Sequence, residues 1–391
     1  MKTREKVLIL DANQRSSLAA TRSLGQRGLY VICADESRKT LAGVSKYTCD
    51  NITYPSPYTE QDKFIDYLVS NLESLSVRYL LPMTDITVEL TLKNKSRLKD
   101  VTILLPDYDS YMSVSDKYQL LEMSLNNEIL IPKTLFMKNL DELMQNIDNI
   151  NYPVVIKPNR SIVVMDGNHY KTTVKYANSK DEILNILKKY PWFRETKILV
   201  QEYIEGHGEG LFVLCKDGEI THYFSHKRLR EKPPSGGVSV LSESIETRDE
   251  MLEIAEKIFG LIKWNGVAMV EFKVAENNQP YLMEVNGRFW GSLQLAIDSG
   301  IDFPFLLYNQ YSNDEELQSI SEYKKGIQLR WLLGDIDNLI IVLKDVTIPC
   351  NEKFKSILKF LKLYRQNQYY EVNRMDDLKP AIYELFNYFK F

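Results

Sequence analysis

The chain lacks the long apolar runs of membrane proteins and the basic excess of general nucleic-acid binders. None of its 391 residues lie in a segment with the roughly 18 consecutive apolar residues that a membrane-spanning helix requires, and the apolar run before Asp11 is too short for a secretion signal. The formal net charge is −4, which argues against nucleic acid or an anionic membrane as a general partner, although a local basic patch stays compatible with it. We therefore expect a cytoplasmic protein with small-molecule partners, no nucleic acid and no membrane; a homodimer is compatible with this expectation.

Cysteine and histidine are both scarce. The four cysteines are far apart in the sequence and form no CxxC motif, so we expect them to be reduced. Two of the four histidines, His222 and His226, have the spacing of a metal pair on a helix. The aromatic segment between them predicts a strand instead, and no cysteine or third histidine supports a zinc site.

A GxGxxG dinucleotide fingerprint is also missing from the N-terminal part of the chain. Within residues 1–110, short apolar runs alternate with amphipathic segments, which predicts an α/β fold with a doubly wound, mostly parallel sheet. The predicted strands end at Asp11, Asp35, Asp85 and Asp107. Polar residues at the carboxyl ends of parallel strands suit a ligand crevice. The first turn, DANQRSS, disfavours a nicotinamide or flavin cofactor.

The pattern of the sequence changes near residue 112 and again near residue 311. We expect a helix over 115–125 with a serine as its cap, followed by strands over 152–158 and 197–204. A polar stretch between these strands predicts a hairpin. The part after residue 311 has mixed strand and helix character. These changes predict three successive parts of the chain.

The segment VAMVEFKVAENNQPYLMEVN predicts a β-hairpin that sets two acids opposite each other. If Asn277 and Asn278 are the central residues of a type I′ turn, Glu271 faces Glu284, and Asn286 follows one pair further along the same face. The other face of this hairpin is wholly apolar, as a core-facing surface should be.

Two facing carboxylates need compensation, because like charges opposite each other across strands destabilise a sheet. A divalent cation would supply it, since carboxylate and amide oxygens are ligands that magnesium prefers. A solvent-exposed face, or a longer loop that shifts the register, is the alternative. Arg288 follows on the same side and either pairs with an acid or holds a phosphate or carboxylate.

Several basic residues lie where phosphate groups could be bound. Lys157 ends an apolar strand, and Lys117 lies in the first turn of a predicted helix, where a cation opposes the helix dipole. Arg228 belongs to the run 226–237, which ends in a Pro-Pro-Ser-Gly-Gly hinge and predicts a mobile anion-binding loop. The ordinary alternatives are a strand-end lysine whose head reaches solvent, a tolerated helix-start lysine and a solvated charged loop.

Taken in order, these features resemble the ATP-grasp superfamily. They are a lysine near a helix start, Ile-Lys-Pro at a strand end, Gln-Glu-Tyr-Ile-x-Gly, an acid in a glycine turn, and Glu…Glu-x-Asn-x-Arg. The segments HKRLREKPPSGGVSV and LMEVNGRFWGS are most similar to the carboxylate–amine ligase-like branch, which is related to the ATP-binding domains of carbamoyl-phosphate synthase. The resemblance implies a Rossmann-like pre-ATP-grasp domain over 1–112, an ATP-grasp domain over 113–310 with a small lid lobe over 113–198 and a large lobe over 199–310, and a C-terminal mixed or helical segment over 311–391.

The resemblance also implies a role for each matching residue. Lys117 and Lys157 match the lysines that contact the nucleotide phosphates, and Arg288 matches the arginine near the γ-phosphate and the acyl phosphate. We expect Lys157, Arg228 and Arg288 to take part in catalysis. The adenine-binding hinge is matched by Gln201, Glu202, Tyr203 and Ile204, the ribose-binding acid by Glu209, and the magnesium ligands by Glu271, Glu284 and Asn286.

These roles imply an ATP-dependent ligase that activates a carboxylate as an acyl phosphate and joins it to an amine, releasing ADP and phosphate. The amine or carboxylate is expected to be an amino acid or peptide-like, and two magnesium ions are expected, with manganese as an alternative. One segment departs from the family: the phosphate-covering loop NRSIVVMDGNHYKT has the single glycine Gly167, where the family is glycine-rich. Two alternatives stay open, namely phosphate transfer to another acceptor and a nucleotide-binding regulatory protein with little turnover.

Overall fold

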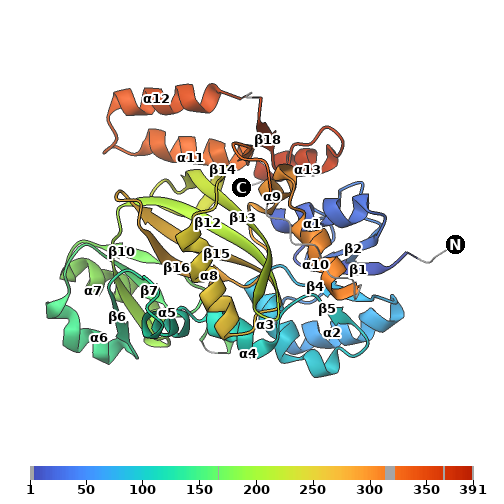
Figure 1. Ribbon diagram of the computed structural model, residues 1–391, viewed down its shortest axis with the longest axis horizontal. Helices are drawn as coiled ribbons and strands as arrows, with labels where there is room; N and C mark the ends of the chain where they lie inside the picture. Colours follow the sequence, from blue (N-terminus) through green and yellow to red (C-terminus); the bar gives the residue numbers. More distant parts are fainter. Residues whose placement is uncertain (1–3, 166, 313–321, 364–365, 390–391) are drawn as a thin grey trace.

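The N-terminal part of the chain forms a parallel five-stranded sheet with helices on both faces (Figure 1). The computed structural model describes residues 4–165, 167–312, 322–363 and 366–389. The predicted doubly wound sheet is confirmed, with strand order β3-β2-β1-β4-β5. The polar edge strand β3 was not expected from the apolar runs. The elements are β1 (Lys6–Ile9), α1 (Arg15–Gln26), β2 (Tyr30–Asp35), β3 (Asp50–Thr53), α2 (Gln61–Ser74), β4 (Tyr79–Leu81), α3 (Asp85–Lys93) and β5 (Thr102–Ile103).

A small antiparallel sheet follows, with strand order β10-β7-β11-β6. Its apolar face packs against two helices, through fully buried residues that include Ile156 and Ile183. The polar stretch after β7 forms the predicted hairpin, β8–β9. The elements are α4 (Tyr108–Ser115), α5 (Lys117–Asn126), β6 (Thr134–Met137), α6 (Leu140–Asn146), β7 (Val154–Pro158), β8 (Ile162–Met165), β9 (Asn168–Lys171), β10 (Lys175–Ala177), α7 (Lys180–Lys189) and β11 (Ile198–Glu202).

A seven-stranded sheet forms the centre of the molecule, with order β16-β15-β12-β13-β14-β17-β18. Helix α8 packs on one face, and α9 and α10 pack on the other, where Phe212 and Trp290 are buried with their ring centroids 4.0 Å apart. The elements are β12 (Gly206–Lys216), β13 (Glu219–Lys232), β14 (Val238–Ile245), α8 (Asp249–Leu261), β15 (Gly266–Ala275), β16 (Pro280–Asn286), α9 (Leu293–Ser299), α10 (Phe303–Ser312), β17 (Gln328–Arg330) and β18 (Gln368–Tyr370).

The C-terminal part adds three helices and returns to the N-terminal part. They are α11 (Leu332–Lys344), α12 (Cys350–Leu361) and α13 (Lys379–Tyr388). Residues 371–377, which we call the C-terminal clasp, lie against α1 through Arg22, which donates to the carboxylate of Asp377. No helix among the described residues is long and apolar enough to cross a membrane.

The structure qualifies two of the expected boundaries and one expected cap. β11 pairs within the small sheet and so crosses the expected lobe boundary at 198/199, and α10 crosses the expected boundary at 310/311. The C-terminal strands β17 and β18 extend the large sheet rather than forming a separate layer. The helix expected over 115–125 begins at Lys117, and Asp116 rather than a serine caps it, because its carboxylate accepts the N–H groups of Tyr118 and Gln119.

Candidate active site

The hairpin β15–β16 carries the row of acids that the sequence predicted. Glu271 pairs with Glu284, and Met269 pairs with Asn286, as expected. We call Glu271, Glu284 and Asn286 the acid row. All three side chains are half-buried, so the alternative of a fully solvent-exposed face is wrong.

The loop that connects these two strands is not the predicted type I′ turn. The strands close through a three-residue loop in which Asn278 adopts the left-handed conformation, with φ of 66°. This longer loop alone would shift the register by one residue. A bulge beyond Glu271 absorbs the shift, because Phe272 pairs with Leu282 and leaves Met283 as the extra residue. The expected pairing of Phe272 with Met283 is therefore wrong, whereas the pairing of the acids is confirmed because loop and bulge offset each other.

Two basic side chains compensate the facing acids in this structure. Nη2 of Arg228 lies 2.5 Å from Oε2 of Glu271, and Nζ of Lys117 lies 3.2 Å from Oε2 of Glu284. The amide nitrogen of Asn286 donates to one oxygen of each acid, at 3.1 and 3.4 Å. Each carboxylate therefore has a cation beside it and an amide shared with the other.

The environments of the two acids drive their pKa values apart. Burial raises the pKa of Glu271, and the guanidinium of Arg228 opposes this rise only in part. Burial acts in the same direction on Glu284, but the charges of Lys117 and Lys157 outweigh it and lower the pKa of that carboxyl to about 2. Glu284 therefore remains ionised at physiological pH, as a ligand for a cation should be.

Lys117 is held in place by a buried polar cap. The side-chain amide of Asn159 donates to the carboxylate of Asp116 at 2.7 Å, and the N–H of Lys117 donates to the carbonyl of Asn159 at 2.7 Å. Nζ of Lys117 also donates to Oγ of Ser161 at 3.2 Å. Burial would lower the pKa of Lys117, but the neighbouring Glu284 outweighs burial and raises it. The lysine therefore stays charged beside the acid row.

Lys157 is buried rather than reaching solvent, so the ordinary strand-end alternative is wrong. Its Nζ donates to Oε1 of Gln201 at 2.6 Å, and Nε2 of Gln201 donates in turn to Oγ1 of Thr134 at 3.0 Å. Gln201 thus orients a buried amine. Burial lowers the pKa of Lys157 to about 8, so a small change of environment alters its charge.

The other residues of the predicted hinge lie where the small sheet connects to the large sheet. The carboxylate of Glu202 accepts the N–H of Lys133 at 2.7 Å. Tyr203 is 43% exposed, and its ring meets that of Tyr176 edge-to-face with centroids 6.0 Å apart. Ile204 is half-buried in the connection itself. These residues form the connection between the two sheets.

Arg288 pairs with an acid that the sequence did not link to it. Its Nε and Nη2 donate to the two carboxylate oxygens of Asp85 at 2.7 and 3.0 Å. Burial would raise the pKa of Asp85, but Arg288 outweighs it, and the pKa is lowered. Asp85 follows β4 of the N-terminal sheet and begins α3. The only signal for it in the sequence was its place among the polar residues that end the parallel strands.

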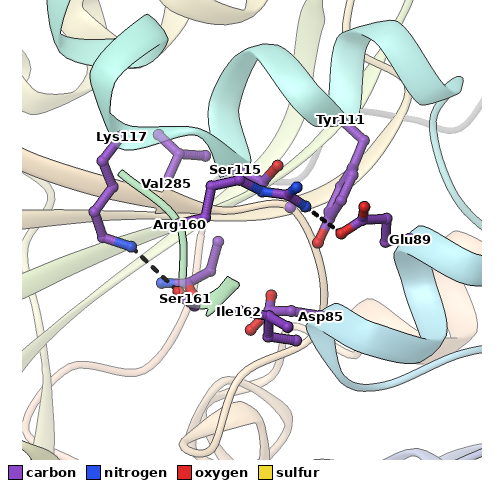
Figure 2. A pocket seen from close by; sticks show the side chains of 11 residues that line it. Asp85, Glu89, Tyr111, Ser115, Lys117, Arg160, Ser161, Ile162 and Val285 are labelled. Carbon is purple, nitrogen blue, oxygen red and sulfur yellow. Dashed lines mark hydrogen bonds and ion pairs between the residues drawn. The ribbon is translucent and has the colours of Figure 1, made fainter. Parts of the chain in front are cut away.

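A small cavity of about 20 Å³ lies beside the acid row, between the N-terminal part and the hairpin β8–β9. Figure 2 shows Lys117 directed to Ser161 and Arg160 directed to Glu89, with Tyr111 near that pair. Arg160 pairs with Glu89 of α3. At this size the cavity has room for about one water molecule. The cavity is small because the charged side chains contact each other across it.

Arg228 lies on an ordered strand rather than in the expected mobile loop. β13 extends to Lys232, so only residues 233–237 form the connection to β14. Nη1 of Arg228 donates to Glu231 at 3.1 Å. A side chain at Gly208 would come within 3.2 Å of Cδ of Arg228, so this glycine leaves room for the guanidinium.

The structure does not bring Glu209 to the acid row. Glu209 pairs across the sheet with Phe272, and its neighbour Gly210 pairs with Glu271, so Glu209 and the acid row lie on opposite faces of the sheet. Its carboxylate accepts from the guanidinium of Arg248, next to α8, at 2.9 and 3.2 Å. Sequence spacing could not show this, because one residue of register decides the face of a strand.

The chain is similar to several known proteins. A family model described as "ATP-grasp in the biosynthetic pathway with Ter operon" matches residues 194–334. D-alanine–D-alanine ligase B of Clostridium perfringens is 26% identical over 165 residues, which are 39% of this chain and 51% of that protein. D-alanine–D-alanine ligase B of Clostridium tetani is 26% identical over 171 residues, 41% of this chain and 46% of that protein. The chain thus spans about half the length of these curated relatives.

Solved structures share the fold over most of the chain. The L-amino acid ligase from Bacillus licheniformis has a TM-score of 0.62 and 16% identity, covering 80% of this chain and 75% of that chain. The N5-carboxyaminoimidazole synthetase from Staphylococcus aureus complexed with ADP has a TM-score of 0.64 and 14% identity, covering 89% of this chain and 87% of that chain. With the family match over residues 194–334, these similarities show that the chain shares the fold of these solved structures and is similar in this region to ATP-grasp proteins.

Proposed function

We propose that this chain is an ATP-dependent ligase that joins a carboxylate to an amine and releases ADP and phosphate. The observation that carries the proposal is the acid row, with Glu271 facing Glu284 and with Lys117 and Lys157 close by. Hard oxygen ligands beside fixed cations are what a nucleotide triphosphate and its metal require. The similarity to D-alanine–D-alanine ligases and an L-amino acid ligase supports an amino acid or peptide-like substrate.

The acid row fits Mg²⁺ by the chemistry of its donor atoms. Mg²⁺ binds proteins through one or two carboxylates and completes its coordination with water and substrate phosphates. Among the described residues there is no cluster of three or more His, Cys, Asp or Glu side chains that could hold a metal, so phosphate oxygens would complete the site. We propose two Mg²⁺ ions, with Mn²⁺ as the alternative, held by Glu271, Glu284 and Asn286. Bound there, they would neutralise charge on the phosphates.

The nucleotide would lie between the small and the large sheet. Lys117 and Lys157, which converge on Glu284, would bind the phosphates. The backbone around Glu202 and Tyr203, with Gln201 and Ile204 beside it, would contact the adenine edge. The cation–acid contacts Lys117–Glu284 and Arg228–Glu271 would loosen as phosphates and metal replace them. Glu209 is left out of this site because it lies on the other face of the sheet.

The reaction has two steps. An oxygen of the substrate carboxylate attacks the γ-phosphorus, the bond to the bridging oxygen breaks, and ADP leaves. The amine nitrogen then attacks the acyl carbon, loses a proton and displaces phosphate. Arg288 and Arg228 would donate hydrogen bonds where negative charge develops. Asp85 would hold the guanidinium of Arg288 in position through its two hydrogen bonds. The division into domains 1–112, 113–310 and 311–391 is part of this proposal.

A nucleotide-binding regulatory protein with little turnover is the second candidate. The hairpin β8–β9, at the position of the phosphate-covering loop, has only Gly167 as a glycine, with φ of 76°. The hairpin also contacts the N-terminal part, through His169 and Gln61 and through the pair Arg160–Glu89 beside it. Side chains instead of bare backbone amides near the phosphates would slow transfer.

One assay separates these functions. The protein is incubated with ATP, Mg²⁺ and pools of amino acids and dipeptides, and ADP and free phosphate are measured separately. The ligase releases both, and only when a carboxylate and an amine are present. ADP without free phosphate would indicate phosphate transfer to another acceptor. Nucleotide binding without turnover on any pool would indicate the regulatory protein.

A further inference from the structure

The helical hairpin α11–α12 projects from the body of the molecule. Figure 1 shows α12 as the outermost element at the top of the view, with α11 between it and the large sheet. No residue of α12 is fully buried. A helix of this composition, CNEKFKSILKFL, normally covers its apolar residues. The contacts of α12 with the rest of the chain decide which of its faces are covered.

The inner face of α12 is anchored to the chain. The guanidinium of Arg330 lies 4.5 Å from the ring centroid of Phe360 and donates to its carbonyl at 2.9 Å. Nζ of Lys353 donates to the carbonyl of Leu343 at the end of α11, at 2.9 Å. Ile357 is half-buried between these two contacts along the helix. These residues fix the rotation of α12 about its axis and so decide which residues face outward.

The outer face carries an apolar stripe at helical spacing. Phe354, Leu358 and Leu361 are 61%, 48% and 60% exposed. They follow one another at intervals of four and three residues, which places them on one side of the helix. At the tip of the hairpin, Val346 is 93% exposed. A contiguous apolar surface of this kind marks an interaction site.

Lysines border this stripe and make the α12 segment locally basic. Residues 350–363 contain four lysines and one acid, Glu352, which gives a net charge of +3 in a chain whose total is −4. Glu352 pairs with Lys355 at 2.7 Å. Lys359 and Lys362 are exposed and form no ion pair with any residue in the described ranges.

We propose that the outer face of α12 docks the protein on an anionic lipid bilayer. Phenylalanine and leucine on one side of a helix with lysines beside them are typical of helices that lie in the membrane interface, where the apolar residues enter the acyl boundary and the lysines meet anionic headgroups. A second copy of the chain fits less well, since a two-fold contact through this face would set lysines against lysines. This proposal is independent of the proposed ligase activity.

Vesicle co-sedimentation of the full-length chain tests the proposal. We expect binding to vesicles of phosphatidylcholine mixed with phosphatidylglycerol, little binding to phosphatidylcholine alone, and weaker binding as salt rises, because salt screens the lysines. Lys359→Glu combined with Lys362→Glu should lower the partition coefficient at least about tenfold, since each basic residue near the surface contributes about 1 kcal/mol. Phe354→Ser combined with Leu361→Ser should lower it while leaving the charge unchanged.

The matched control is Lys99→Glu combined with Lys188→Glu, which makes the same change of charge at exposed positions elsewhere. This control should bind vesicles as the unchanged protein does. Loss of binding in the control as well would show a general charge effect and would overturn the proposal. So would absence of binding to anionic vesicles at low salt. Sedimentation equilibrium that shows a dimer abolished by the Phe354 and Leu361 changes would assign the face to a second copy instead.

Discussion

Two groups of buried charge in this protein differ in how their charges are arranged. In the C-terminal clasp, Arg22 donates to the carboxylate of Asp377 and to the carbonyls of Glu371 and Val372, each at 2.9 Å. Asp377 also accepts from the hydroxyl of Ser45 at 2.7 Å. Every charge there meets its opposite, and the donors of the arginine are used by groups more than 300 residues away in sequence.

The acid row is arranged in the opposite way. Glu271 and Glu284 face each other across a strand pair, with Arg228 beside Glu271 and Lys117 beside Glu284. Nζ of Lys157 donates to the neutral amide of Gln201, and burial lowers the pKa of this lysine. Burial of charge therefore does not by itself identify a site. In the candidate active site, two acids face each other, and the neighbouring cations could turn towards a ligand. This arrangement distinguishes the candidate active site from the clasp.

The largest expected effect is on the clasp. Arg22→Met should lower the free energy of unfolding by about 3–5 kcal/mol, because it leaves Asp377 buried without its cation. Denaturant unfolding measures this change. Turnover per folded molecule should be unchanged. The matched control is Lys63→Met, which removes a cation from an exposed pair with Glu60 and should leave stability unaltered. A loss of turnover by Arg22→Met without destabilisation would show that the clasp serves the active site.

Glu284→Gln should affect turnover and leave the fold unchanged. Turnover should fall by about a hundredfold to a thousandfold, the range seen when one fixed electrostatic contact to the reacting charge is removed. The circular dichroism spectrum should be unchanged. ADP release measured against Mg²⁺ concentration checks the result, with Glu219→Gln as an exposed control. If Glu284→Gln retains the activity and its dependence on Mg²⁺, the metal assignment is wrong.

Lys157 should give turnover at the active site a pH dependence. Because burial lowers its pKa to about 8, the amine is charged below that pH and neutral above it. Since phosphate binding needs the charge, kcat/KM for ATP should fall up to about tenfold for each pH unit above 8. Lys157→Arg should abolish this decline, because the guanidinium keeps its charge. Lys117→Arg should leave it in place, since the pKa of Lys117 is already raised.

The smallest expected effect concerns the loop that closes the acid hairpin. Asn278→Ala should lower the free energy of unfolding by about 1 kcal/mol, because alanine tolerates a positive φ poorly. Asn278→Gly should be close to neutral, since glycine adopts this conformation freely. Turnover should be retained in both, because the bulge at Met283 also sets the pairing of the acids. Loss of turnover in both variants would show that the loop alone sets the pairing of the acids.

The sequence predicted the structural features that depend on residues close together in the chain. Alternating apolar runs predicted the parallel N-terminal sheet, and the spacing around Glu271 and Glu284 predicted their pairing. The register was right although the turn was wrong, because two departures from the ideal hairpin offset each other. Asp116 caps α5 in place of the expected serine, and its carboxylate also accepts a hydrogen bond from the distant Asn159. Local propensity could not include that long-range bond.

By itself, the sequence determined which side chains alternate on one strand and which acids face each other, because a strand has a period of two. Only the tertiary structure decided their partners. Arg288 meets Asp85 from 203 residues away, and Glu209 lies on the far face of the sheet. The exposed side of α12 depends on the contact of Arg330 with its inner face. Each of these outcomes depends on contacts between elements that are distant in sequence. Such contacts set the register of the strands and the rotation of the helices, which no short stretch of the chain encodes.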